Sequence, residues 1–456
     1  MADEGEEHGR SDTLPAIEIP PWVGRARAAA GRLESAPTLG ALILASSLTG
    51  LVAVYVASVY CRQYTFAGLL SFRPYDPPTP MPGWMYPEPF GVHFFGDFLL
   101  PLRHSELALP YDTPGMVPSY YPLFAKVVLK PFLLFDYRQA LVLFLLVTFV
   151  GLLAPIWAML AHRPISERLF LTLPLLVTGP MIVVFDRGNL QGLVAAAALI
   201  GMVGLLRGNN TAAGFWFGIA AAMKAYPVLL LLLLVRVRDW RAAAVGLVTG
   251  AVATFGSLLF FEGGAIGNLQ ALWRTTDAFR DINLDRALTG NHSFKGGFAA
   301  MMVNGPDWLH GSATWVYENY GAVSVVLTIA LMALAGSRTT SLFGAVTYLA
   351  VVMSFGVGVS YGYVPIMMLL AVIVVYAGQL ERNVPTACYL LVLALLLAPK
   401  GVMVGSSPLA LHTYLSPLLA TVLVGLVLPG DVRRLCSAWR ARRSRTLGGR
   451  PATEPA

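Results

Sequence analysis

The sequence predicts an all-α polytopic membrane protein, built as a bundle of about ten transmembrane helices. Of its 456 residues, 56% are hydrophobic and only 12% are charged, which is about half the charged fraction of a typical soluble domain. The mean hydropathy is +0.65. The apolar runs are continuous rather than alternating, which indicates membrane helices and argues against a barrel of strands.

The charged residues divide the chain into a membrane domain and two cytoplasmic ends. Residues 1–37 are acidic, then Pro-rich, then basic, which predicts a disordered cytoplasmic arm leading into an uncleaved signal-anchor. Residues 38–429 form the transmembrane domain. Residues 430–456 form a basic cytoplasmic tail, because the positive-inside rule places arginine-rich ends in the cytoplasm. The net charge of +7 therefore indicates membrane orientation rather than nucleic-acid binding.

Each predicted span is an apolar run near the length that crosses the hydrocarbon core, about 20 residues. The predicted spans are 38–60, 140–161, 169–185, 190–206, 242–261, 321–336, 341–359, 363–378, 386–399 and 411–428. The segment 122–135 is apolar but contains Lys126, Lys130 and Pro131. We expect it to be an interfacial helix.

Residues 211–235 pose a topological problem. Arg207 precedes this segment and Arg236 follows it, so a single crossing would place the later basic cluster on the wrong side. Two half-helices that meet at residues 224–227 solve the problem, because Pro227 breaks a helix. The sequence therefore predicts a re-entrant helical hairpin, with a single span as the alternative.

This topology places the longest polar segments on the extracytoplasmic side. They are the first loop, residues 61–139, with interfacial helices in it, the turn 186–189, the loop 262–320 and the turn 360–363. The sequence shows no internal repeat of the kind found in many transporters. We therefore expect a multi-pass cell-membrane protein with cytoplasmic termini and its polar site outside.

Several short strings, taken in order, resemble glycosyltransferase family 87, whose members are membrane enzymes of the GT-C superfamily. They are Gly96-Asp97, Ser119-Tyr120-Tyr121-Pro122, Phe185-Asp186-Arg187-Gly188-Asn189-Leu190, Gly214-Phe215-Trp216-Phe217-Gly218, Lys224-Ala225-Tyr226-Pro227, Arg238-Asp239-Trp240-Arg241 and Gly290-Asn291-His292-Ser293. The chain departs from the family pattern at Tyr361 and Tyr363, where many relatives carry tryptophan and histidine, and at Leu123, where relatives have a second proline.

The resemblance implies a GT-C-type bundle and a polyprenyl-phosphate-sugar-dependent enzyme. Such an enzyme would transfer a sugar, with mannose favoured, to a lipid-linked or glycan acceptor of the cell envelope, with inversion. Arabinofuranose is the alternative sugar. A lipid or sugar transporter is the alternative from another class, and a catalytically inactive scaffold is a third.

Asp97 is the candidate catalytic residue. Glycosyl transfer needs a base on the acceptor hydroxyl, and the resemblance assigns that role to this carboxylate in the first loop. The alternative is structural, because Asp97 precedes Phe98-Leu99-Leu100 and could be a helix N-cap.

Positive side chains are the candidates for binding the donor phosphate. Arg187 can hold a phosphate with two hydrogen bonds, or can pair locally with Asp186. Lys224, near the tip of the predicted hairpin, needs a partner such as a lipid phosphate or Asp186. His292 is the third candidate, with loop polarity as its alternative.

Further polar and aromatic residues are expected to bind substrate. They are Arg103, His104, Tyr121, Asn189, Asn291, Tyr361 and Tyr363, with Trp84, Tyr86, Phe94, Phe95 and Tyr120 as stacking or membrane-belt aromatics. No cluster has metal-ligand spacing, so no cofactor is expected. The alternative is a weakly bound divalent cation held by Asp97 with Asp112 or Glu106.

Overall fold

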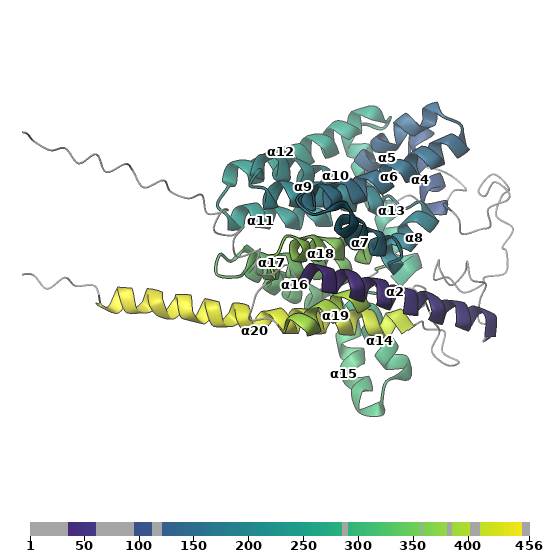
Figure 1. Cartoon of the computed structure of the whole chain (residues 1–456). Coiled ribbons are helices and arrows are strands. Elements are labelled where there is room, and N and C mark those ends of the chain that lie inside the picture. Colours follow the sequence, from purple (N-terminus) through teal and green to yellow (C-terminus); the bar gives the residue numbers. More distant parts are fainter. Residues whose placement is uncertain are drawn as a thin grey trace, which may run out of the picture.

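The computed structural model describes residues 35–60, 95–111, 121–284, 291–356, 358, 360–380, 385–401 and 411–448. Within these residues every regular element is a helix, as predicted (Figure 1). The amino-terminal half contains α2 (Ser35–Tyr60), α4 (Gly96–Glu106), α5 (Leu123–Leu129), η1 (Lys130–Leu134), α6 (Tyr137–Met159), α7 (Ile165–Leu176), α8 (Gly179–Arg187), α9 (Gln191–Leu206) and α10 (Asn210–Met223).

The second half is also helical throughout its described residues. It contains η2 (Tyr226–Leu230), α11 (Leu231–Arg236), α12 (Trp240–Ser257), η3 (Leu258–Phe260), α13 (Gly264–Leu284), α14 (Phe294–Asn304), α15 (Asp307–Glu318), α16 (Tyr320–Gly336), α17 (Leu342–Phe355), η5 (Val364–Met368), α18 (Leu369–Tyr376), α19 (Thr386–Leu397) and α20 (Leu411–Gly448).

Four helical segments are long and apolar enough to cross a membrane: Ser35–Ala57, Tyr137–Met159, Trp240–Phe260 and Leu411–Ala441. Two bent pairs, α7 with α8 and α15 with α16, raise this number to six if each pair is one span. Large apolar side chains on α6, α12 and α16 are exposed, as expected for surfaces that face lipid. The polytopic class is therefore supported, whereas a count of ten spans stays a prediction.

The predicted span 169–185 is not one straight helix. It is divided between α7 and α8, whose axes are bent by 65°. Pro180 stands at the start of α8 and has no N–H to continue the ladder of α7, so the helix ends and restarts. The first loop also has helical structure: α5 and η1 together occupy most of the predicted interfacial segment 122–135.

The predicted hairpin is present at residues 210–236. Its first arm is α10 and its second arm is η2 with α11, and the break falls between Met223 and Tyr226. The Nδ2 of Asn210 donates to Oδ2 of Asp239 at 2.9 Å, so the chain enters and leaves the hairpin at neighbouring points. The chain therefore turns back as two half-helices, whereas the re-entry of this hairpin into the membrane stays a prediction.

Glycines bring α10 close to α12. A Cβ on Gly214 would lie 2.1 Å from the Ala242 carbonyl oxygen, and one on Gly218 would lie 2.3 Å from the Gly246 carbonyl oxygen. Close backbone contact of this kind needs small residues at the interface, a common device in membrane helices. The contact fixes the hairpin against α12 and so positions Lys224 at its tip.

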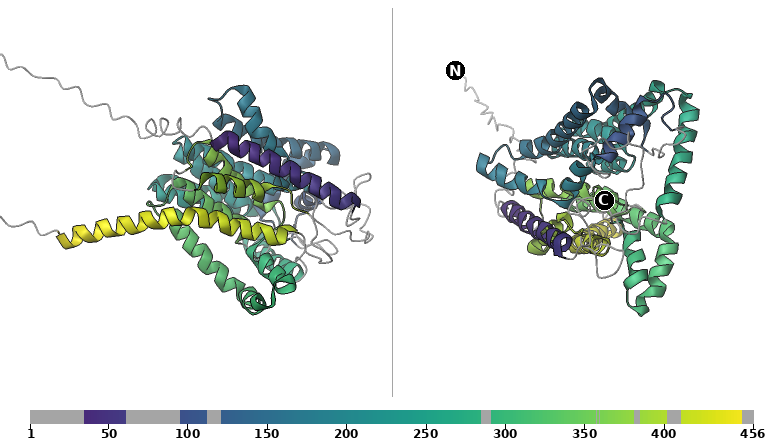
Figure 2. Two further views of the ribbon diagram at one scale, coloured as in Figure 1. Left: turned by 60° about the horizontal axis from the view of Figure 1, so that its bottom comes forward. Right: turned by 90° about the vertical axis from the view of Figure 1, so that its right-hand side faces the viewer.

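The helices α9, α17 and α18 form the most deeply buried part of the bundle, and every residue of α18 and all of α17 except Leu342 are buried. In Figure 1, α4 and α8 lie at the right-hand end of the bundle and the carboxyl end of α20 projects at the left. Figure 2 shows the same projection of α20 from a second direction.

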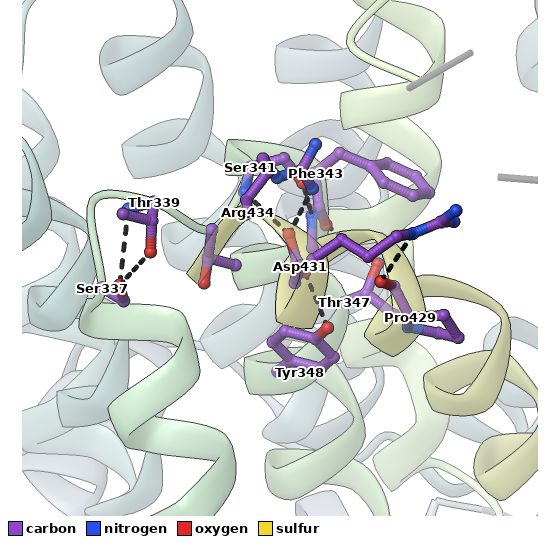
Figure 3. Close-up of polar contacts among 12 residues, drawn as sticks. Ser337, Thr339, Ser341, Phe343, Thr347, Tyr348, Pro429, Asp431 and Arg434 are labelled. Atoms are coloured by element: carbon purple, nitrogen blue, oxygen red, sulfur yellow. Dashed lines mark hydrogen bonds and ion pairs between the residues drawn. The ribbon is translucent and has the colours of Figure 1, made fainter. Parts of the chain in front are cut away.

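A buried carboxylate joins α20 to α17. Asp431 is 0% exposed and accepts hydrogen bonds from Tyr348 Oη at 2.7 Å and from the backbone N–H of Ser341 at 3.1 Å (Figure 3). Arg434, one turn further along α20, pairs with the same carboxylate. Asp431 lies in the segment predicted to be a basic tail, and no role was predicted for it.

Candidate active site

Asp97 lies in the first turn of α4, and it is not the N-cap. The helix begins at Gly96, and the N-cap position is occupied by Phe95 in a left-handed conformation with φ of 60°. The backbone N–H of Phe95 donates to the carbonyl oxygen of Asp186 at 2.9 Å. This bond ties the start of α4 to the end of α8, so the N-cap alternative for Asp97 is wrong.

The end of α8 provides two donors for the Asp97 carboxylate. Arg187 donates from Nε to Oδ2 at 2.8 Å and from a terminal nitrogen to Oδ1 at 3.2 Å. Asn189 donates from Nδ2 to Oδ2 at 2.7 Å. Hydrogen bonds from a guanidinium and an amide favour the ionised carboxylate, which is the form that can accept a proton.

The turn between these two donors requires glycine. Gly188 ends α8 with φ of 60° in the left-handed region, which L side chains rarely adopt. A Cβ at this position would also lie 2.8 Å from Cβ of Phe98 on α4. Gly188 therefore allows α4 to pack closely on the turn, and this packing brings Asp97 within reach of Arg187 and Asn189.

Tyr121 and Lys224 form a second layer beside this pair. The hydroxyl of Tyr121 lies 3.4 Å from Nδ2 of Asn189. The Nζ of Lys224 lies 5.3 Å from the ring centre of Tyr121 and 5.4 Å from that of Tyr363, and it donates to Oε1 of Gln191 at 3.0 Å. Lys224 follows the carboxyl end of α10, where the helix dipole favours a cation.

A buried lysine contacts Tyr111, which in turn bonds to the backbone of Tyr121. Lys126 of α5 is fully buried, donates to the carbonyl oxygen of Pro110 at 3.1 Å and lies 3.5 Å from the ring centre of Tyr111. The Tyr111 hydroxyl donates to the carbonyl oxygen of Tyr121 at 2.6 Å. Burial lowers the pKa of Lys126 to about 6 and raises that of Tyr111. Lys126 is thus inside the fold, although a lysine on an interfacial helix was expected at the surface.

His292 and Asn291 belong to a different polar group. His292 stacks on His412 with ring centres 4.0 Å apart, and its Nδ1 lies 3.1 Å from Oγ of Ser416. Asn291 donates to the carbonyl oxygen of Gly358 at 3.0 Å and accepts from the N–H of Ser360 at 2.9 Å. Burial, with His412 and Lys400 nearby, holds the pKa of His292 well below its usual value. A neutral imidazole offers a phosphate a hydrogen bond but no charge.

The other predicted substrate-binding residues have different neighbours. Arg103 pairs with Glu106 at 3.2 Å, and both side chains are exposed. His104 is fully buried, with Nδ1 2.7 Å from the carbonyl oxygen of Leu100 one turn earlier. Tyr361 is half-buried, with its ring centre 5.8 Å from that of Tyr363.

Asp186 was proposed from the sequence as a partner of both Arg187 and Lys224, and the structure gives each of them a different partner. Arg187 pairs with Asp97 rather than with its neighbour Asp186, and Lys224 bonds Gln191 rather than Asp186. Successive residues on a helix point in different directions, so adjacent side chains do not face each other. Gln191, the first residue of α9, was missed, because a glutamine at a helix start carries no chemical signal in the sequence.

The alternative of a bound divalent cation receives no support from the described residues. Among them, no group of three His, Cys, Asp or Glu side chains could hold a metal ion. Several predicted residues lie outside the described residues. They are Asp112, Trp84, Tyr86, Phe94 and Tyr120.

A comparison with known protein families identifies the chain. The model of Glycosyltransferase family 87 matches residues 120–360, more than half of the 456 residues. The match includes Arg187, Asn189 and Lys224, and the fold brings Asp97, which precedes it, into contact with the first two. No curated protein and no solved structure matches the chain. The chain therefore belongs to glycosyltransferase family 87 and is a membrane glycosyltransferase.

Proposed function

We propose that this enzyme transfers a sugar, preferentially mannose, from a polyprenyl-phosphate donor to a glycolipid or cell-envelope glycan. Transfer takes place on the extracytoplasmic face and inverts the anomeric centre. The observation that carries the proposal is one cluster of Asp97, Arg187, Asn189, Tyr121 and Lys224, contributed by segments far apart in the sequence. In one site, the carboxylate can act as the base and the two cations beside it can stabilise the departing phosphate.

In the proposed reaction Asp97 acts as the general base. Its side chain is 23% exposed, so an acceptor hydroxyl can reach it. As the acceptor oxygen attacks the anomeric carbon, its proton passes to Asp97. The bond between that carbon and the phosphate oxygen breaks, and its electron pair leaves with the polyprenyl phosphate. Attack opposite to the leaving group inverts the configuration.

The two cations would stabilise the departing phosphate. The guanidinium of Arg187 contacts the Asp97 carboxylate, and the Nζ of Lys224 lies 5.3 Å from the ring centre of Tyr121. Charge that develops in a site of low dielectric is stabilised strongly by groups already in place. As Asp97 takes up the proton, its hold on Arg187 weakens, which frees the guanidinium for the phosphate.

Arabinofuranose is the alternative donor sugar, because the described residues of the cluster around Asp97 do not distinguish one sugar from another. The cytoplasmic placement of both termini is supported by the positive-inside pattern and by the hairpin, whose ends meet at Asn210 and Asp239.

A donor panel tests the proposal. Purified enzyme in detergent is given synthetic decaprenyl-phosphate mannose, decaprenyl-phosphate arabinofuranose or GDP-mannose with a short mannoside acceptor, and the product's anomeric configuration is read by NMR. We expect transfer from the mannosyl lipid with inversion and none from the nucleotide sugar. Transfer from GDP-mannose alone would refute the lipid donor, and transfer from the arabinofuranosyl lipid alone would replace mannose.

A further inference from the structure

The ammonium of Lys224 has no carboxylate in direct contact. No described carboxylate oxygen lies within 4.0 Å of its Nζ, and its hydrogen bond is to the neutral Oε1 of Gln191. The ring centres of Tyr121 and Tyr363 lie 5.3 and 5.4 Å from it, and the charge of Asp97 acts on it only from farther away. A cation inside a protein is costly without a close counter-ion, so this position favours a bound anion.

Two further polar groups next to Lys224 are buried and face each other. The Nε2 of Gln191 lies against the hydroxyl of Tyr226, and neither atom has another hydrogen-bond partner within the described residues. Gln191 is 0% exposed. Buried polar groups in folded proteins are nearly always fully paired, so the phenol O–H and the second amide hydrogen that remain beside Lys224 indicate a missing acceptor.

The amino end of α9 adds positive electrostatic potential at the same place. Gln191 is the first residue of this 16-residue helix, so the positive end of the helix dipole lies at its backbone. The amino end of a helix favours anions, phosphate above all. The three donors therefore stand where the backbone also favours negative charge.

We propose that Lys224, Gln191 and Tyr226 form a phosphate seat that receives the phosphate of the lipid donor. The inference rests on the proposed function and adds Gln191 and Tyr226 as phosphate-binding residues. A phosphate oxygen only accepts hydrogen bonds, and the seat offers an ammonium, an amide N–H and a phenol O–H. The ammonium supplies charge and the two neutral donors supply direction, so the seat discriminates a phosphate from an uncharged lipid alcohol.

Binding of three probes tests the seat directly. Decaprenyl phosphate, decaprenol and inorganic phosphate are titrated against wild type, Tyr226→Phe and Gln191→Leu in detergent. The matched controls are Tyr317→Phe on α15 and Gln139→Leu in the first turn of α6. We expect each seat variant to raise the Kd for decaprenyl phosphate about tenfold, the usual loss for one hydrogen bond to a charged group. Decaprenol binding and both controls should stay at wild-type values.

Three results would overturn the seat. Wild-type affinity of both seat variants for decaprenyl phosphate would remove Gln191 and Tyr226 from phosphate binding. Equal losses for decaprenol would indicate damaged packing. Inorganic phosphate that binds with the same dependence on both residues would assign the seat to free phosphate instead of the donor. If Gln191→Leu does not fold, Tyr226→Phe decides alone, because it removes one oxygen and keeps the ring.

The same variants separate this inference from the proposed function. If wild type transfers mannose from the lipid donor while the seat variants keep full affinity, only the seat fails. If no polyprenyl-phosphate sugar is used but the seat variants still lose affinity for decaprenyl phosphate, the seat stands and the proposed reaction fails.

Discussion

Asp97 and Asp431 are both carboxylates paired with an arginine, yet their surroundings differ in every other respect. Asp431 is 0% exposed, and its oxygens accept from Ser341 and Tyr348, which bind α20 to α17, and from Arg434 of its own helix. Asp97 is 23% exposed, its arginine comes from residue 187 of another helix, and the charge of Lys224 acts on it from nearby.

The difference teaches that residue type alone does not mark an active site. A carboxylate whose oxygens are enclosed by donors of two packed helices contributes to folding, because removing it leaves those donors without a partner. A carboxylate that keeps an accessible face in a cluster of cations can exchange protons with a substrate. We therefore expect Asp97 to affect the reaction and Asp431 to affect stability.

The largest expected effect is that of Asp97→Asn. The amide keeps the shape of the side chain but cannot take up the acceptor proton, so we expect kcat to fall about 10²- to 10⁴-fold. The Kd for decaprenyl phosphate should change little, because Asp97 does not hold the phosphate. Asp307→Asn, an exposed carboxylate at the start of α15, is the control and should keep the wild-type rate.

Asp431→Asn should instead lower the free energy of unfolding by about 2 kcal/mol, because Tyr348 and Arg434 lose a charged acceptor. The measurement is the thermal midpoint in detergent by intrinsic fluorescence. Transfer by the fraction that remains folded should match wild type. A large loss of kcat with an unchanged midpoint would reverse the role assigned to this carboxylate.

A smaller effect is expected from Arg187→Lys, which keeps the charge and removes the two-point contact with Asp97. We expect kcat to fall about tenfold, equivalent to about 1.4 kcal/mol of transition-state stabilisation. Steady-state kinetics with the lipid donor measure it. An unchanged kcat would mean that the geometry of the guanidinium has no part in the reaction.

The smallest expected effect is that of Tyr348→Phe at the buried end of the bundle. It removes one hydrogen bond to Asp431 and should cost about 1 kcal/mol of stability. A double-mutant cycle with Asp431→Asn checks the assignment, because the two losses should not add. Fully additive losses would show that the Tyr348 hydroxyl stabilises the fold independently of Asp431.

Much of this architecture could be predicted from the sequence, because composition and proline positions act locally. The helical class and the break before Pro227 followed from such signals. The single helix predicted for 169–185 failed, although Pro180 signalled the bend. For Asp97, Asn189 and Tyr121, the sequence predicted only that they lie on the same side of the membrane, and it did not predict that they are in contact.

The pairing of side chains could not be predicted, because it depends on directions that only the packed helices fix. Arg187 turns to Asp97 across 90 residues and leaves its neighbour Asp186. His104 turns inward to its own helix. Asp431 looked like one acid in a solvated arginine-rich tail, but α20 continues through it and packs on α17.

The most direct test of the central claim is to measure transfer rate and thermal midpoint together for Asp97→Asn and Asp431→Asn in one detergent preparation. The account predicts that the two defects separate in kcat. The folded Asp97→Asn enzyme loses at least about 100-fold in kcat, whereas Asp431→Asn loses stability and keeps its kcat. A folded Asp97→Asn enzyme that transfers mannose at the wild-type rate would contradict the assignment of Asp97 as the base.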